Sequence, residues 1–66
     1  MKNRLKVARA EMDITQGELA EKIGVTRQAV NSIELGKYVP STVLALKMAK
    51  LFNKPVEELF MLEDGD

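Results

Sequence analysis

Four side chains with hydrogen-bonding groups lie close together in the middle of this 66-residue chain: Arg27, Gln28, Asn31 and Ser32. Their spacing places them on the outward side of a single helix, close to its N-terminus. In the major groove of DNA, arginine pairs well with guanine, and glutamine or asparagine pairs well with adenine. The chemistry that this group favours is recognition of base edges by a helix inserted into a groove.

Such a helix needs a partner that holds it, and the preceding residues predict one. Thr15 is followed three residues later by Glu18, which is the pattern of a capping box at a helix start. Gly24 then tolerates the positive φ that ends a helix, and it lets the chain reverse within about three or four residues. Ala20 is small where the second helix would cross the first closely. The stretch 16–35 is therefore predicted to be a helix-turn-helix.

The remaining segments carry apolar residues at helical spacing. Ser41 precedes one of them as a cap, and Pro55 stands at the first position of another, where its missing N–H is not needed. We expect an all-α fold of five short helices in one domain over residues 1–66. The predicted helices span residues 3–11, 16–23, 27–35, 42–52 and 55–60, and an acidic tail spans 61–66.

The composition argues against catalysis. The chain has no cysteine and no histidine, so it lacks a thiolate and the commonest general base and metal ligand. Its two serines, Ser32 and Ser41, do not lie in a nucleophile-elbow pattern, and no glycine-rich phosphate loop is present. We expect no enzyme, no cofactor and no metal. No apolar run approaches a membrane span, so we expect no membrane partner and a cytoplasmic location.

The charge distribution is uneven although the formal net charge is zero. All ten lysines and arginines lie within residues 1–54, together with five of the ten acids. Residues 55–66 hold the other five acids and no basic residue. A basic body with an acidic end is compatible with DNA on one face and a different contact on the other.

Several motifs together carry a resemblance to a known family. They are T-Q-x-E-L-A at 15–20, the run Gly24–Thr26, Gln28, Val30, Ile33 and Glu34 in the second helix, G-K-Y-x-P-S at 36–41, and the later segments A-L-K-M-A-K and P-V-E-E-L-F. With Leu5 and Arg9, these residues resemble the Cro/repressor-type helix-turn-helix proteins of the XRE family. The resemblance implies a lambda-repressor-like fold and a transcriptional regulator that binds double-stranded DNA sequence-specifically. It further implies a repressor that acts as a homodimer on a palindromic operator.

The resemblance also implies roles for single residues. Base contacts would come from Arg27, Gln28 and Ser32, joined by Asn31. Contacts to the DNA backbone would come from Gln16, Thr26, Lys37, Tyr38 and Ser41. Arg9 and Glu34 would form a partly buried ion pair that holds the recognition helix, although two solvated charges remain the alternative.

Two questions stay open at this level. The dimer interface is predicted to lie at the C-terminal end and to use Val39, Val56, Met61 and Leu62, but Met61 and Leu62 could instead fold back as a short strand beside residues 1–3. The other question concerns the class of function. An antitoxin, or another protein-interaction module of the same fold, could use the acidic tail to bind a basic partner.

Overall fold

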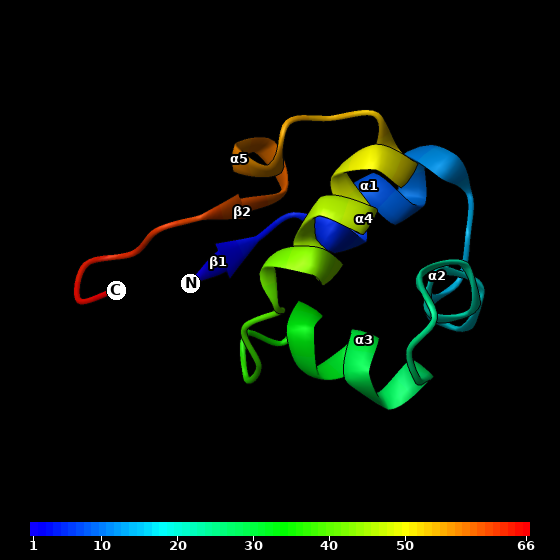
Figure 1. The fold of residues 1–66 in the computed structure, drawn as a ribbon, viewed down its shortest axis with the longest axis horizontal. Coiled ribbons are helices and arrows are strands. Elements are labelled where there is room, and N and C mark those ends of the chain that lie inside the picture. Colours follow the sequence, from blue (N-terminus) through cyan, green and yellow to red (C-terminus); the bar gives the residue numbers. More distant parts are fainter.

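The computed structural model describes residues 1–66 and is built mainly from five helices (Figure 1). The elements in chain order are β1 (Lys2–Asn3), α1 (Leu5–Met12), α2 (Gln16–Ile23), α3 (Arg27–Glu34), α4 (Thr42–Phe52), α5 (Val56–Leu59) and β2 (Phe60–Met61). The all-α, lambda-repressor-like class is confirmed, with a two-stranded sheet as a minor addition. Figure 1 shows the two chain ends side by side, at the opposite end of the molecule from α2.

One hydrophobic core joins all five helices. Its twelve buried residues are Leu5, Ala8, Leu19, Ala20, Ile23, Val30, Ile33, Leu44, Met48, Phe52, Leu59 and Phe60. Ala20 is only 3% exposed, and α2 and α3 pack more extensively against each other than any other pair of elements. A larger side chain at Ala20 would push the two helices apart, because cores packed at crystal density tolerate little added volume.

The helix ends are capped as their residue types predict. Thr15 Oγ1 accepts a hydrogen bond from Glu18 N at 3.0 Å, and Thr15 N donates to Glu18 Oε1 at 2.9 Å, which completes the capping box of α2. Thr26 and Ser41 cap α3 and α4 with one hydrogen bond each. Thr26 Oγ1 accepts from Ala29 N at 3.1 Å, and Ser41 Oγ accepts from Leu44 N at 3.2 Å. Gly24 ends α2 at a φ of 77°, a conformation that disfavours other residues.

The structure corrects the predicted bounds at both ends of the chain. The first helix begins at Leu5 rather than residue 3, since Lys2 and Asn3 pair with Met61 and Phe60 in an antiparallel sheet. For the same reason α5 ends at Leu59 rather than residue 60. The sheet that had been only the alternative for Met61 is therefore formed.

Asn3 connects this sheet to α3, a role that no sequence pattern indicates. Its Nδ2 donates to Ile33 O at 2.8 Å and to Glu34 O at 3.4 Å, two carbonyl groups in the last turn of α3. Its Oδ1 accepts from Leu5 N at 3.2 Å and so caps the start of α1. One side chain thus fixes the last turn of α3 to the start of the chain.

Candidate nucleic-acid interface

The outer surface of α3 and the loop behind it form a shallow concavity of about 410 Å³. Gln28 and Ser32 line it from α3, Lys37 and Tyr38 line it from the loop, and Thr26 lies at its end. All but the half-buried Ser32 are exposed. The structure therefore brings together two residues predicted to read bases and three predicted to contact the DNA backbone.

A second concavity, of about 420 Å³, lies at the other side of the helix-turn-helix. Gln16 and Arg27 line it together with residues of α1 and the turn after it. The exposed Arg27 guanidinium and the amide of Gln16 thus flank the start of α3 on the side opposite Lys37. Ser41 is exposed but lies outside both concavities, where its oxygen caps α4.

Arg9 and Glu34 form a two-pronged ion pair between α1 and the end of α3. Arg9 Nε donates to Glu34 Oε2 at 2.6 Å and Nη2 donates to Oε1 at 3.1 Å. The Glu34 side chain is 1% exposed and that of Arg9 is 17% exposed, so the alternative of two solvated charges is wrong. The hydrogen bond to Glu34 raises the pKa of Arg9. Arg9 Nη1 also donates to Ile14 O at 3.1 Å, which ties in the link before α2.

Gln16 extends this network across the helix-turn-helix. Its Nε2 donates to Glu34 Oε1 at 3.0 Å and to Asn31 Oδ1 at 3.2 Å. The sequence pointed to Gln16 as a phosphate contact only. In the structure its side chain also joins the first turn of α2 to α3, which fixes the two helices at the ends nearest to the candidate DNA surface.

Comparison with known proteins decides the family. The model of the Helix-turn-helix family matches residues 5–59, which span all five helices. The chain belongs to the helix-turn-helix family. The resemblance to XRE-type regulators that the motifs carry is confirmed.

Two relatives of similar length and one longer relative are similar to this chain. This helix-turn-helix chain is 50% identical over 66 residues to an HTH-type transcriptional regulator of Methanocaldococcus jannaschii, with all of both chains covered. It is 50% identical over 64 residues to the HTH-type transcriptional regulator YgzD of Bacillus subtilis, with 97% of each chain covered. It is 36% identical over 59 residues to the ImmF control region 10 kDa protein of Bacillus phage phi105, covering 89% of this chain and 66% of that one.

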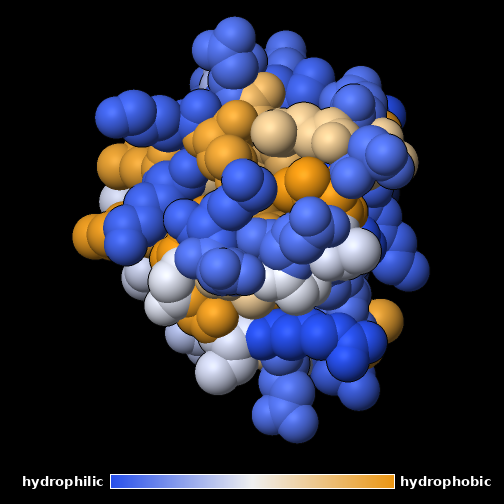
Figure 2. Space-filling view, turned by 90° about the vertical axis from the view of Figure 1, so that its right-hand side faces the viewer, coloured by the Kyte–Doolittle hydropathy of each residue, from blue (hydrophilic) through white to orange (hydrophobic).

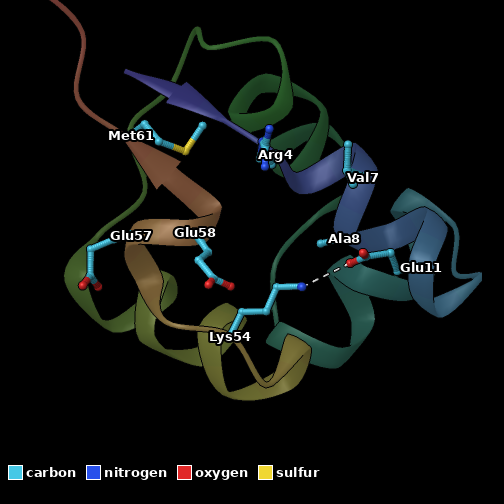
Figure 3. Close-up of a pocket in the computed structure, with 8 residues that line it drawn as sticks. All are labelled: Arg4, Val7, Ala8, Glu11, Lys54, Glu57, Glu58 and Met61. Carbon is cyan, nitrogen blue, oxygen red and sulfur yellow. Dashed lines mark ion pairs between the residues drawn. The ribbon is translucent and has the colours of Figure 1, made fainter.

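Elsewhere on the helix-turn-helix domain the surface chemistry is different. A cleft of about 540 Å³ between α1 and α5 carries both signs of charge (Figure 3). Arg4 and Lys54 line it together with Glu11, Glu57 and Glu58, and Lys54 Nζ lies 3.4 Å from Glu11 Oε1. Three carboxylates against two cations would repel a polyanion. This cleft is therefore a poorer DNA surface than α3.

The face on the α2 side is covered mainly by hydrophilic residues, with hydrophobic ones showing between them (Figure 2). None of the helices is long and apolar enough to cross a membrane.

Proposed function

We propose that this helix-turn-helix transcriptional regulator binds a specific operator as a dimer and represses transcription by occupying the promoter. The observation that carries the proposal is the concavity along α3, where Gln28 and Ser32 lie beside Lys37 and Tyr38. Side chains for base edges and side chains for phosphates then meet the same stretch of duplex. Phosphate contacts fix the register of a protein on DNA, while base contacts give the sequence preference.

Each polar residue of this surface has a role in the proposal. Arg27, Gln28, Asn31 and Ser32 contact bases, and Gln16, Thr26, Lys37, Tyr38 and Ser41 contact the DNA backbone. The cap bonds leave this chemistry available. Thr26 Oγ1 accepts from Ala29 N at 3.1 Å, and a hydroxyl that accepts one bond keeps its hydrogen to donate to a phosphate.

The dimer follows from the small size of the reading surface. One recognition helix contacts only a few base pairs, and a two-fold pair of helices doubles the site, with half-sites about 34 Å apart. An apolar groove of about 340 Å³ runs between α4, α5 and the loop before α4. Val39, Leu46 and Val56 line it, and Val39 and Leu46 are 62% and 57% exposed. A second copy that covered this groove would remove these side chains from water.

This proposed dimer surface differs in part from the predicted one. Val39 and Val56 remain in it, and Leu46 joins them. Met61 instead lines the cleft at α1 and is half-buried in β2, so we omit it (Figure 3). Leu62 is 81% exposed just after β2 and stays available for the contact.

Sedimentation equilibrium tests the dimer. We expect the wild-type chain to dimerise at micromolar concentration and Leu46→Asp to be monomeric with unchanged helical content by circular dichroism. Lys47→Asp is the matched control, because Lys47 is the exposed neighbour on α4 but does not line the groove. A wild-type chain that stays monomeric and binds a palindrome no better than a half-site would contradict the dimer.

Selection of bound sequences from random duplex DNA tests the operator. We expect enrichment of a palindrome whose half-sites lie about 34 Å apart. Transcription in vitro from a promoter that carries the selected site should then fall as protein is added. Failure to enrich any sequence would contradict the proposal, and enrichment with increased transcription would leave DNA binding but overturn repression.

The alternative of an antitoxin-like tail receives no support from the tail itself. Glu63 Oε1 and Asp66 Oδ2 lie 3.1 and 3.2 Å from the N-terminal ammonium of Met1. Two of the tail's acids are thus engaged within their own chain, which leaves fewer of them for a basic partner.

A further inference from the structure

A continuous relay of hydrogen bonds runs from the buried ion pair to the outer face of α3. Arg9 donates to both oxygens of Glu34, Gln16 Nε2 donates to Glu34 Oε1 at 3.0 Å, and the same Nε2 donates to Asn31 Oδ1 at 3.2 Å. These four side chains are described below as the Arg9–Asn31 relay. It begins at a carboxylate that is 1% exposed and ends at an exposed amide.

The chemistry of the groups fixes the direction of every bond in the relay. An ionised carboxylate can only accept, so the atom of Gln16 that faces Glu34 must be its NH₂ group. An NH₂ group can only donate, so the atom of Asn31 that faces it must be the carbonyl oxygen. Amide orientation is otherwise ambiguous between oxygen and nitrogen, but here the charge on Glu34 decides it. Asn31 Nδ2 is consequently turned away from Gln16.

We propose that Gln16 is a positioning residue that holds the amide of Asn31 so that Asn31 offers DNA a donor and selects guanine rather than adenine. The proposal rests on the proposed function of α3 as the recognition helix. An asparagine that reads adenine uses both ends of its amide, the oxygen on N6 and the nitrogen on N7. In the relay the oxygen is directed to Gln16, and the free NH₂ group meets the adjacent acceptors N7 and O6 that guanine presents.

Gln28 provides an internal contrast on the same helix. Its side chain is exposed, and none of the side-chain hydrogen bonds within the chain involves it. Its amide can therefore rotate to present either end, which is what a two-bond contact to adenine requires. Two amides on α3 thus differ in what they select, because only Asn31 is held by a neighbour.

The experiment is selection from random duplexes with the wild type, Asn31→Ala, Gln16→Met and Gln28→Ala. Asn31→Ala identifies the base pair that Asn31 reads, because preference is lost there. At that pair we expect the wild type to prefer guanine over adenine by roughly 5- to 100-fold. Gln16→Met keeps the length of the side chain but removes its donor, so we expect it to admit adenine at that pair. Gln28→Ala should lose preference at a different pair and keep guanine at this one.

The outcomes distinguish failure of the relay from failure of the proposed DNA-binding function. A wild type that enriches no sequence would contradict the proposed function itself. A wild type that enriches a site but prefers adenine at the Asn31 pair, or an Asn31→Ala variant that loses preference nowhere, would overturn the relay alone. The relay would be overturned equally if Gln16→Met weakened binding to all sequences alike without admitting adenine at that pair, since that is the effect of a lost phosphate contact alone.

A thermal melt followed by circular dichroism would show whether Gln16→Met still folds. A second variant, Asn31→Asp, tests the relay without changing Gln16. Asn31→Asp keeps an acceptor for Gln16 but replaces the outward donor with a second acceptor. We expect the preferred base at that pair to change from guanine to cytosine, whose N4 amino group donates. Retention of guanine in Asn31→Asp would overturn the relay.

Discussion

Two of the sites where a positive group contacts carboxylates differ in their surroundings. Arg9 and Glu34 meet inside the helix-turn-helix, where the carboxylate is 1% exposed and a second donor, Gln16, completes its shell. The N-terminal ammonium meets Glu63 and Asp66 beside the small sheet, where those side chains are 44% and 31% exposed. The carboxylate of the first site is shielded from water, and both carboxylates of the second site are exposed to it.

Contact distance alone therefore does not measure how much an ion pair contributes to stability. Water and salt screen the charges at the open site, and exposed pairs contribute little to stability. At the buried site, loss of one partner leaves an uncompensated charge in a poorly solvated place. We therefore expect changes near Glu34 to affect both stability and DNA binding, and changes near Asp66 to affect neither strongly.

The largest effect is expected from breaking the buried pair. Glu34→Ala should lower the free energy of unfolding by about 3–5 kcal/mol, because the half-buried Arg9 guanidinium would lose its carboxylate. Urea denaturation of Glu34→Ala, Arg9→Ala and the double variant measures it. We expect a coupling free energy of about 0.5–3 kcal/mol between Arg9 and Glu34. If the effects of the two single variants simply add, the ion pair contributes nothing to stability.

A smaller effect, on binding, distinguishes the two kinds of contact on the DNA surface. Gln28→Ala should cost about 1–3 kcal/mol on the preferred site and relax the preference at one base pair. Lys37→Ala should weaken binding to all sequences alike and lower the slope against the logarithm of salt concentration by about one unit. Salt titrations on specific and random duplexes measure both. Equal weakening of both duplexes by Gln28→Ala would contradict its role as a base contact.

The capping box of α2 gives the next effect in size. Thr15→Ala should lower the free energy of unfolding by about 1 kcal/mol, because Glu18 N loses its acceptor. The backbone N–H of Thr15, followed by its hydroxyl, lowers the pKa of Glu18. The contribution of Glu18 to stability is therefore present above the pKa of a free glutamate and is lost as pH falls through its lowered pKa. Urea denaturation at several acidic pH values should show that the free energy of unfolding changes less with pH for Glu18→Gln than for the wild type.

The smallest effect is expected at the open site. The backbone N–H of Glu63, followed by the N-terminal ammonium, lowers the pKa of Asp66, and hydrogen bonds to Glu63 and Asp66 raise the pKa of that ammonium. The stabilisation by the ammonium is present below its usual pKa and is lost as pH rises through the raised one. Asp66→Asn should nevertheless change the free energy of unfolding by less than the experimental error of urea denaturation. A loss of stability as large as that expected for Thr15→Ala would contradict the contrast between the Arg9–Glu34 pair and the exposed N-terminal site.

The helices and the cap residues could be predicted from the sequence because their signals are local. Thr15, Glu18 and Gly24 lie within one or two helical turns of the backbone groups that they satisfy. The pairing of Arg9 with Glu34 came from the resemblance rather than from spacing. The burial of the Glu34 side chain is what excludes two solvated charges, and that burial depends on the fold.

The relay could not be predicted, and the sheet could be stated only as an alternative, because both depend on contacts between distant segments. Strands of two residues carry no alternation that a pattern could reveal. The contact of Gln16 with Asn31 depends on where α2 and α3 cross, and Asn3 finds the end of α3 only after β1 has paired. The position of Met61 beside α1 could not be predicted for the same reason, since it depends on the pairing of β2 with β1.

The pairing of β1 with β2 has a consequence for the order in which the chain folds. Lys2 and Met61 are 59 positions apart, whereas α2 and α3 are neighbours joined by a short turn. Closing a long loop costs more chain entropy than closing a short one, so the helical hairpin gains its contacts at an earlier stage. Once the helical core has formed, the two strands are already close together, so less chain entropy is lost when they pair. We expect amides of the strands to exchange with solvent through local opening well before those of α2 and α3.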